Sequence, residues 1–136
     1  MEKELEQERR KREMENNAYL RLNHISIQSI SPDQVVLTAE LLPELTNPYG
    51  MAHGGLLFTM GDCCAGMTAR GDGRKYVTLN AEMQYLSNVD HGTLTARSHV
   101  IRRGRSICVV GVRICDEEDR PLTEGTFTMY CVSGEK

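Results

Sequence analysis

The stretch that decides the fold is "NPYGMAHGGLLFTMGDCCAGMTAR", residues 47–70. After the motif His-Gly-Gly at 53–55, apolar residues lie on all sides of a helical projection, and two glycines follow at 71 and 73. Apolar residues all around the axis are typical of a helix that is buried on most sides. Glycine commonly ends a helix. We therefore predict one long buried helix from about 54 to 70.

Asp62 is the exception in this helix. A carboxylate among apolar residues must be paired, lose its charge or face a water-filled cleft. A structural aspartate held by nearby hydroxyl or N–H groups is one interpretation. A general base or nucleophile is the other.

The sequence around this helix predicts strands. Residues 75–86 alternate strictly, which places Val77, Ala81 and Met83 on one face and Thr78 on the other. Short turns between the later segments predict antiparallel neighbours, including a pair formed across the turn at 90–92. Together these features predict an α+β domain in which about six antiparallel strands curl around one helix. The expected strands are 24–30, 34–41, 75–86, 93–101, 105–115 and 122–132.

Residues 1–18 are predicted to form a charged helical extension, followed by a single domain at 19–136. Opposite charges four residues apart favour an exposed helix. A solvated helix leading into the domain is the simpler interpretation, and a partner-binding arm is the alternative. The pairs are Glu6 with Arg10, Glu8 with Arg12 and Arg9 with Glu13.

Composition excludes several classes of protein. A formal net charge of −3 argues against a general nucleic-acid binder, which needs a concentrated basic surface. The 5 cysteines are odd in number and contain no C-x-x-C pair, which favours reduced thiols over disulfides or a zinc site. His24, His91 and His99 lack ligand-like spacing, so we expect no metal. No run approaches the roughly 18 apolar residues of a membrane span. We expect a soluble, cytoplasmic protein.

The start of the helix is the second candidate for chemistry. The first N–H groups of a helix lack internal partners and carry the positive end of its dipole. Because Gly54 and Gly55 have no side chains, a carbonyl or anion could approach their N–H groups closely. These glycines form an oxyanion hole or merely allow a tight entry into the helix, and the residues alone do not decide between the two.

Spacing constrains how the two candidates could cooperate. Eight residues separate Gly54 from Asp62, which is roughly 12 Å along a helix axis. An aspartate side chain cannot span that distance. If both groups act on one carbonyl, they must come from two subunits whose helices run antiparallel about a twofold axis. A homodimer with composite sites is thus a prediction of the catalytic hypothesis.

The turn "IRRGRS" supplies three arginines. A solvated turn is the simpler interpretation, and a clamp for phosphate groups is the functional one. The residues are Arg102, Arg103 and Arg105.

The residues quoted above, with the strand order, resemble the hot-dog-fold acyl-CoA thioesterases of the phenylacetate-pathway type. The matching pattern is Asn47, a displaced Gly50, the His53-Gly54-Gly55 motif and Asp62, and the similarity extends over roughly residues 20–133. The resemblance implies a curved sheet wrapped around a central helix, in proteins that commonly assemble as a dimer of dimers.

The resemblance also implies a mechanism. Gly54 N–H would polarise a thioester carbonyl, Asn47 and His53 would shape the site, and the neighbouring subunit's Asp62 would activate water or attack directly. Thr78 takes the position of a residue that helps hold the water. Coenzyme A enters as part of the substrate rather than as a cofactor, with Gly55 and the three arginines as candidate contacts.

Two other functions are compatible with the same fold. A hydratase or dehydratase needs a histidine paired with an acid, and its expected motifs are absent. A non-catalytic acyl-CoA-binding module tends to lack the acidic residue that this chain keeps. Few aromatic residues are present, so the acyl group is left open.

Overall fold

A computed structural model of the chain describes residues 2–133, apart from the side chains of Lys3 and Glu13. It contains three α-helices, two short 3-10 turns and six strands. The helices are α1 (Glu2–Glu15), α2 (Ala18–Leu22) and α3 (Gly54–Ala69), and the 3-10 turns are Pro43–Leu45 and Arg70–Asp72. The strands are β1 (Ile25–Ser31), β2 (Gln34–Glu40), β3 (Tyr76–Tyr85), β4 (Thr93–Arg103), β5 (Ile107–Cys115) and β6 (Pro121–Cys131).

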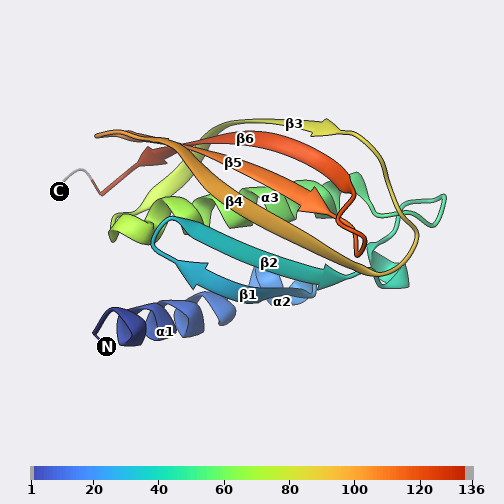
Figure 1. Cartoon of the computed structure of the whole chain (residues 1–136), viewed down its shortest axis with the longest axis horizontal. Helices are drawn as coiled ribbons and strands as arrows, with labels where there is room; N and C mark the ends of the chain where they lie inside the picture. The colour runs from blue at the N-terminus through green and yellow to red at the C-terminus, as the bar shows by residue number, and fades with distance from the viewer. Residues whose placement is uncertain (1, 134–136) are drawn as a thin grey trace.

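The six strands form one antiparallel sheet in the order β1-β2-β4-β5-β6-β3. Figure 1 shows the sheet curving around α3, with β1 and β3 at its two edges and α1 beside β1. Buried side chains from the inner face of the sheet and from α3 make one continuous core. The predicted α+β fold, with one long helix inside a curved sheet, is confirmed.

The central helix α3 runs for 16 residues, as its apolar composition predicts. It approaches the sheet closely at Gly61, where a Cβ atom would lie 2.7 Å from Met83 Cε and 2.8 Å from Phe127 Cζ. Any side chain at this position would force Met83 and Phe127, or the helix itself, to shift. After the turn Arg70–Asp72, Gly73 has φ +87, a left-handed conformation that glycine adopts without steric cost.

The predicted pairing of β3 with β4 is wrong. β3 instead pairs with β6, and β4 lies between β2 and β5. The connection at 86–92 is not a hairpin turn: Leu86 N–H donates to Leu122 O in β6, and Gly92 O accepts from Leu41 N–H, just after β2. This segment therefore crosses from one part of the sheet to the other, which lets the sheet close around α3.

The predicted faces of β3 also need correction, because the strand contains a β-bulge. The ladder shifts register between Thr78 and Asn80, leaving Leu79 as an extra residue. Thr78 lies opposite buried Met129, and Ala81 lies opposite buried Phe127. Thr78 and Ala81 thus share the face toward α3, although strict alternation would separate them.

The N-terminal segment is helical as predicted, but it does not end at residue 18. α2 continues to Leu22 and buries Leu20 in the core. Arg10 does not pair with Glu6; its guanidinium donates to the carbonyls of Met67 and Ser31. Glu6 instead forms an ion pair with Arg9. The predicted pair of Arg9 with Glu13 falls on a side chain outside those described.

Candidate active site

His53 is the N-cap of α3. Its backbone is extended (φ −69, ψ 134), and its Nδ1 accepts a hydrogen bond from Gly55 N–H at 2.8 Å. The Gly54 N–H has no acceptor among the residues described. Gly54 therefore offers a free donor at the positive end of this helix. The Gly55 N–H, which the sequence suggested as a further substrate contact, is already used by His53.

Asn47 shapes the loop that delivers His53 to this position. Its Oδ1 accepts from Tyr49 N–H at 2.9 Å and from Met51 N–H at 3.0 Å. The loop turns back at Gly50, which has φ +80, a conformation that favours glycine. Asn47 thus acts on the site through the loop, since its carbonyl oxygen is committed to backbone donors.

Tyr85 is a neighbour of the helix start that the sequence did not reveal. Its hydroxyl donates to Gly54 O at 3.1 Å. Its ring Cε1 would lie 3.7 Å from a Cβ atom at Gly54. Nothing in the strand pattern distinguishes this tyrosine from other alternating residues, so only the structure places it here.

Asp62 lies near the middle of α3 and is only partly buried. Its Oδ1 accepts a hydrogen bond from Thr78 Oγ1 at 2.6 Å. The bulge in β3 is what turns Thr78 toward the helix. The structure thus brings Asp62 and Thr78 together and keeps them about 12 Å along the helix from Gly54.

The cysteines beside Asp62 belong to the packing of the helix. Burial, and after it the neighbouring Asp62 charge, raise the pKa of Cys63 to about 11. Burial also raises the pKa of Cys64 to about 12. Both stay protonated at neutral pH, so neither is a nucleophile. All 5 cysteines are free thiols, as predicted.

One of the three arginines near the β4–β5 turn is committed to contacts within the chain. Arg103 donates to Thr68 O at 3.1 Å and Ala69 O at 2.8 Å and pairs with Asp72 at 3.0 Å, so it caps the far end of α3. Arg102 and Arg105 are exposed. The structure brings none of the three into contact with Gly54 or Asp62.

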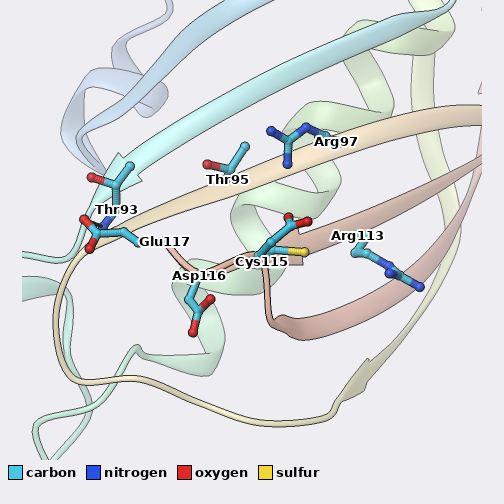
Figure 2. A pocket seen from close by; sticks show the side chains of 8 residues that line it. Thr93, Thr95, Arg97, Arg113, Cys115, Asp116 and Glu117 are labelled. Carbon is cyan, nitrogen blue, oxygen red and sulfur yellow. Dashed lines mark hydrogen bonds between the residues drawn. The ribbon is translucent and has the colours of Figure 1, made fainter.

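A hollow of about 560 Å³ lies on the outer face of the sheet, away from α3. Figure 2 shows Thr93, Thr95 and Arg97 along β4, with Arg113 and Cys115 on the neighbouring strand. Its charged groups mostly have partners: Asp116 accepts from Arg120 N–H, Glu117 accepts from Thr93 N–H, and Arg113 pairs with Glu124. This hollow contains neither the free donor nor the acid of the candidate site.

Within residues 2–133, no group of three or more His, Cys, Asp or Glu side chains is placed to hold a metal ion. In the same part of the chain, no helix is long and apolar enough to cross a membrane.

Comparison with known proteins settles the family. The model of the Thioesterase superfamily matches residues 49–123, a span that runs from just before the helix start to the beginning of β6. The chain belongs to the thioesterase superfamily. It is a thioester hydrolase with the hot-dog fold, and the matched span contains Gly54, Asp62 and Thr78.

Individual relatives agree with this assignment. A hypothetical thioesterase from Streptococcus pneumoniae TIGR4, solved with coenzyme A, is 33% identical over 79% of this chain and 88% of that one, with a TM-score of 0.76. A putative esterase from Haemophilus influenzae is 27% identical over 80% of this chain and 81% of its own length. The E. coli PaaI protein of the phenylacetic acid degradation operon shares the fold, with a TM-score of 0.85 at 22% identity over 89% of this thioesterase and 88% of its own chain.

Proposed function

We propose that this thioesterase hydrolyses an acyl-CoA thioester to the free acid and coenzyme A at composite sites in a homodimer. The observation that carries the proposal is the separation within one chain of a free helix-start donor at Gly54 from the Asp62–Thr78 pair. The coenzyme A bound to the 33% identical streptococcal thioesterase supports the substrate class. Coenzyme A is then part of the substrate, and no other cofactor enters the reaction.

The chemistry follows from what each group can do. Gly54 N–H donates to the thioester carbonyl oxygen and stabilises the negative charge that develops there. In the general-base route, Asp62 takes a proton from water as the water oxygen bonds to the carbonyl carbon. The C–S bond then breaks, and the proton returns to the leaving thiolate. In the nucleophilic route, Asp62 attacks the carbon itself, and the C–S bond breaks to release the thiolate and leave an anhydride. Water then hydrolyses this anhydride, which regenerates the Asp62 carboxylate, releases the acid and supplies the proton that the thiolate takes up.

Supporting residues hold these groups in place. His53 and Asn47 fix the entry into the helix, and the Tyr85 hydroxyl fixes the Gly54 carbonyl. Thr78 orients the Asp62 carboxylate through its 2.6 Å hydrogen bond. This leaves the other carboxylate oxygen as the candidate acceptor for the water proton.

The open edge of the sheet supports the dimer. β3 is an edge strand, and its neighbourhood exposes apolar side chains, including Val77 at 51%, Leu79 at 61% and Leu86 at 56%. An unpaired apolar edge is a template for pairing with another strand. The other edge, β1, is instead flanked by α1 (Figure 1).

Twofold symmetry places the axis of this dimer. Bringing Gly54 of each chain to Asp62 of the other puts the axis near Phe58, midway between them on α3. Tyr85 contacts Gly54 and Thr78 contacts Asp62, so the same arrangement brings Tyr85 of each chain to Thr78 of the other. The twofold axis then passes near Ala81, midway between them on β3. The two positions of the axis agree, because the Phe58 ring lies 5.7 Å from the ring of Phe127, and Phe127 is paired with Ala81. Antiparallel pairing of β3 with its copy therefore satisfies both requirements at once.

Two further features belong to the proposal. We place the protein in the cytoplasm, where free thiols such as its cysteines stay reduced. We also expect two dimers to join as a tetramer, as the family resemblance implies.

Replacing Leu79 by Lys tests the dimer. A buried, unpaired ammonium at the strand edge is unfavourable, so the variant should sediment mainly as a smaller species and lose most activity. Ile101→Lys is the matched control, because Ile101 on β4 is apolar and 54% exposed but lies away from the β3 edge. A Leu79→Lys protein that keeps the wild-type size and activity would exclude the proposed interface.

Release of free thiol from a panel of acyl-CoA esters tests the activity itself. We expect turnover of at least one ester, with the preferred chain identifying the acyl group. Binding of an acyl-CoA without thiol release would instead indicate a binding module, and conversion of an enoyl-CoA to its hydroxyacyl ester would indicate a hydratase.

A further inference from the structure

A cavity of about 470 Å³ lies between α1 and the C-terminal end of α3, at the opposite end of the helix from Gly54. Four arginines line it: Arg9 and Arg10 from α1, and Arg70 and Arg74 from the segment that follows α3. Among the described lining side chains, Glu6 is the one acid. Four positive charges against one negative charge leave this cavity with an excess of +3 among those residues.

Part of this positive charge is explained by the helix end. The last carbonyls of a helix lack internal partners and carry partial negative charge, which cations stabilise. Arg10 donates to Met67 O there, and Arg103 donates to Thr68 O and Ala69 O. Arg10 nevertheless keeps a buried Nε with no hydrogen-bond partner among the described residues.

The other nearby carboxylate is already used. Asp72 accepts from Tyr76 Oη at 2.6 Å and forms ion pairs with Arg74 and Arg103 at 3.1 and 3.0 Å. Glu6 pairs with Arg9. These acids leave Arg10 and Arg70 without a carboxylate partner in the described part of the chain.

Arg70 is the arginine that the helix end does not explain. Its guanidinium lies along α3 against Gly66, where a Cβ atom would be 3.2 Å from Nη1. No hydrogen bond or ion pair to this guanidinium is found within residues 2–133, although burial lowers its pKa below the ordinary value. Arg70 also lowers the pKa of Arg10, after the larger effect of burial. Asp72 and Glu6 offset part of this effect at Arg10, and Cys63 and Asp62 offset part of it at Arg70. None of these acids, all within the described chain, forms an ion pair with either arginine, so an added anion would stabilise two partly buried cations that repel each other.

We propose that this cavity binds a phosphoryl-bearing ligand, with Arg70 and Arg10 as its principal contacts. Guanidinium groups match phosphate oxygens in geometry and charge, and charge-assisted hydrogen bonds of this kind are the strong ones. The volume lies within the range of small-molecule sites. The proposal gives the charged N-terminal helix a role, because α1 supplies half of the arginines. The phosphoryl group could be that of coenzyme A or of a separate phosphorylated compound.

Calorimetric titration of the whole chain with inorganic pyrophosphate tests the site without any need for turnover. We expect binding that weakens as salt is added, and an affinity at least about tenfold lower for Arg70→Gln, since a hydrogen bond to a charged group contributes about that factor. Arg70→Lys should keep part of the affinity. Arg97→Gln removes the same charge on the outer face of the sheet and should bind as the wild type does.

Several results of this titration would overturn the proposed site. No binding to the wild type, or equal binding to Arg70→Gln when its thermal unfolding matches the wild type, would overturn the site. Equal weakening by Arg97→Gln would reduce it to a general charge effect and overturn it as well. This readout is independent of hydrolysis, so the site and the proposed activity can fail separately.

Competition identifies the source of the phosphate. If coenzyme A displaces pyrophosphate, and Arg70→Gln raises KM for an acyl-CoA but not for the matching acyl-pantetheine, the cavity holds the phosphates of the substrate. If coenzyme A does not compete, the ligand is a separate phosphorylated compound. Both results support the anion site and differ in what fills it.

Discussion

Asp62→Asn is expected to lower kcat for thioester hydrolysis by about 10²–10⁴-fold, the usual loss when a general base is removed. The amide has the same size and can still accept the hydrogen bond from Thr78, so the local geometry should persist. It can neither take a proton from water nor attack a carbonyl. If Asp62 acts only on the reacting atoms, as proposed, affinity for the acyl-CoA should stay near that of the wild type. Thiol release and equilibrium binding measure the two quantities separately.

Variants of Thr78 are the matched controls for this result. Thr78→Val removes the donor to Asp62 but keeps the shape of the side chain, and should cost about tenfold in kcat, as expected for one hydrogen bond to a charged group. Thr78→Ser keeps the hydroxyl and should retain most of the rate. An Asp62→Asn protein as active as the wild type would remove the aspartate from the mechanism altogether.

Most of the fold could be predicted from local patterns. The apolar composition of 54–70 identifies a buried helix, and period-two alternation identifies strands, because each reflects which side chains face the core. The order of strands in the sheet could not be predicted from local patterns. β3 and β4 are consecutive but do not pair, since the connection 86–92 crosses between sheet positions. That crossing depends on closure of the sheet around α3, which no local pattern records.

The candidate site also combines residues that the sequence identifies with contacts that only the fold creates. Asp62 is evident from sequence because a carboxylate in an apolar helix is unusual, and Gly54 because a glycine pair opens that helix. The contact of Thr78 with Asp62 depends on the bulge at Leu79, which breaks the alternation from which the faces were predicted. The role of Tyr85 depends on the crossing of β3 over α3. The commitment of Arg103 to the end of α3 likewise involves residues more than 30 positions apart.

A mixture of two inactive variants is expected to regain about a quarter of wild-type activity. Gly54→Pro removes the N–H donor and should be inactive alone, as should Asp62→Asn. If each site takes Gly54 from one chain and Asp62 from the other, a heterodimer holds one intact site and one doubly damaged site. Random mixing makes half of the dimers heterodimers, and half of their sites are intact, which gives about a quarter.

The structure indicates that Gly54→Pro should remove the N–H donor and leave the helix start in place. Proline is tolerated at the first position of a helix, and the residue before it must be extended, as His53 already is at φ −69 and ψ 134. A Cβ atom at Gly54 would meet Tyr85 at 3.7 Å, an ordinary contact. Gly54→Ala, which keeps the N–H, is therefore the matched control and should stay active. The mixture is unfolded gently, refolded and assayed by thiol release, and heterodimers are verified with two affinity tags. A heterodimer holds one site in which both Gly54 and Asp62 are intact. If proven heterodimers are inactive, Gly54 and Asp62 do not serve one site across the interface.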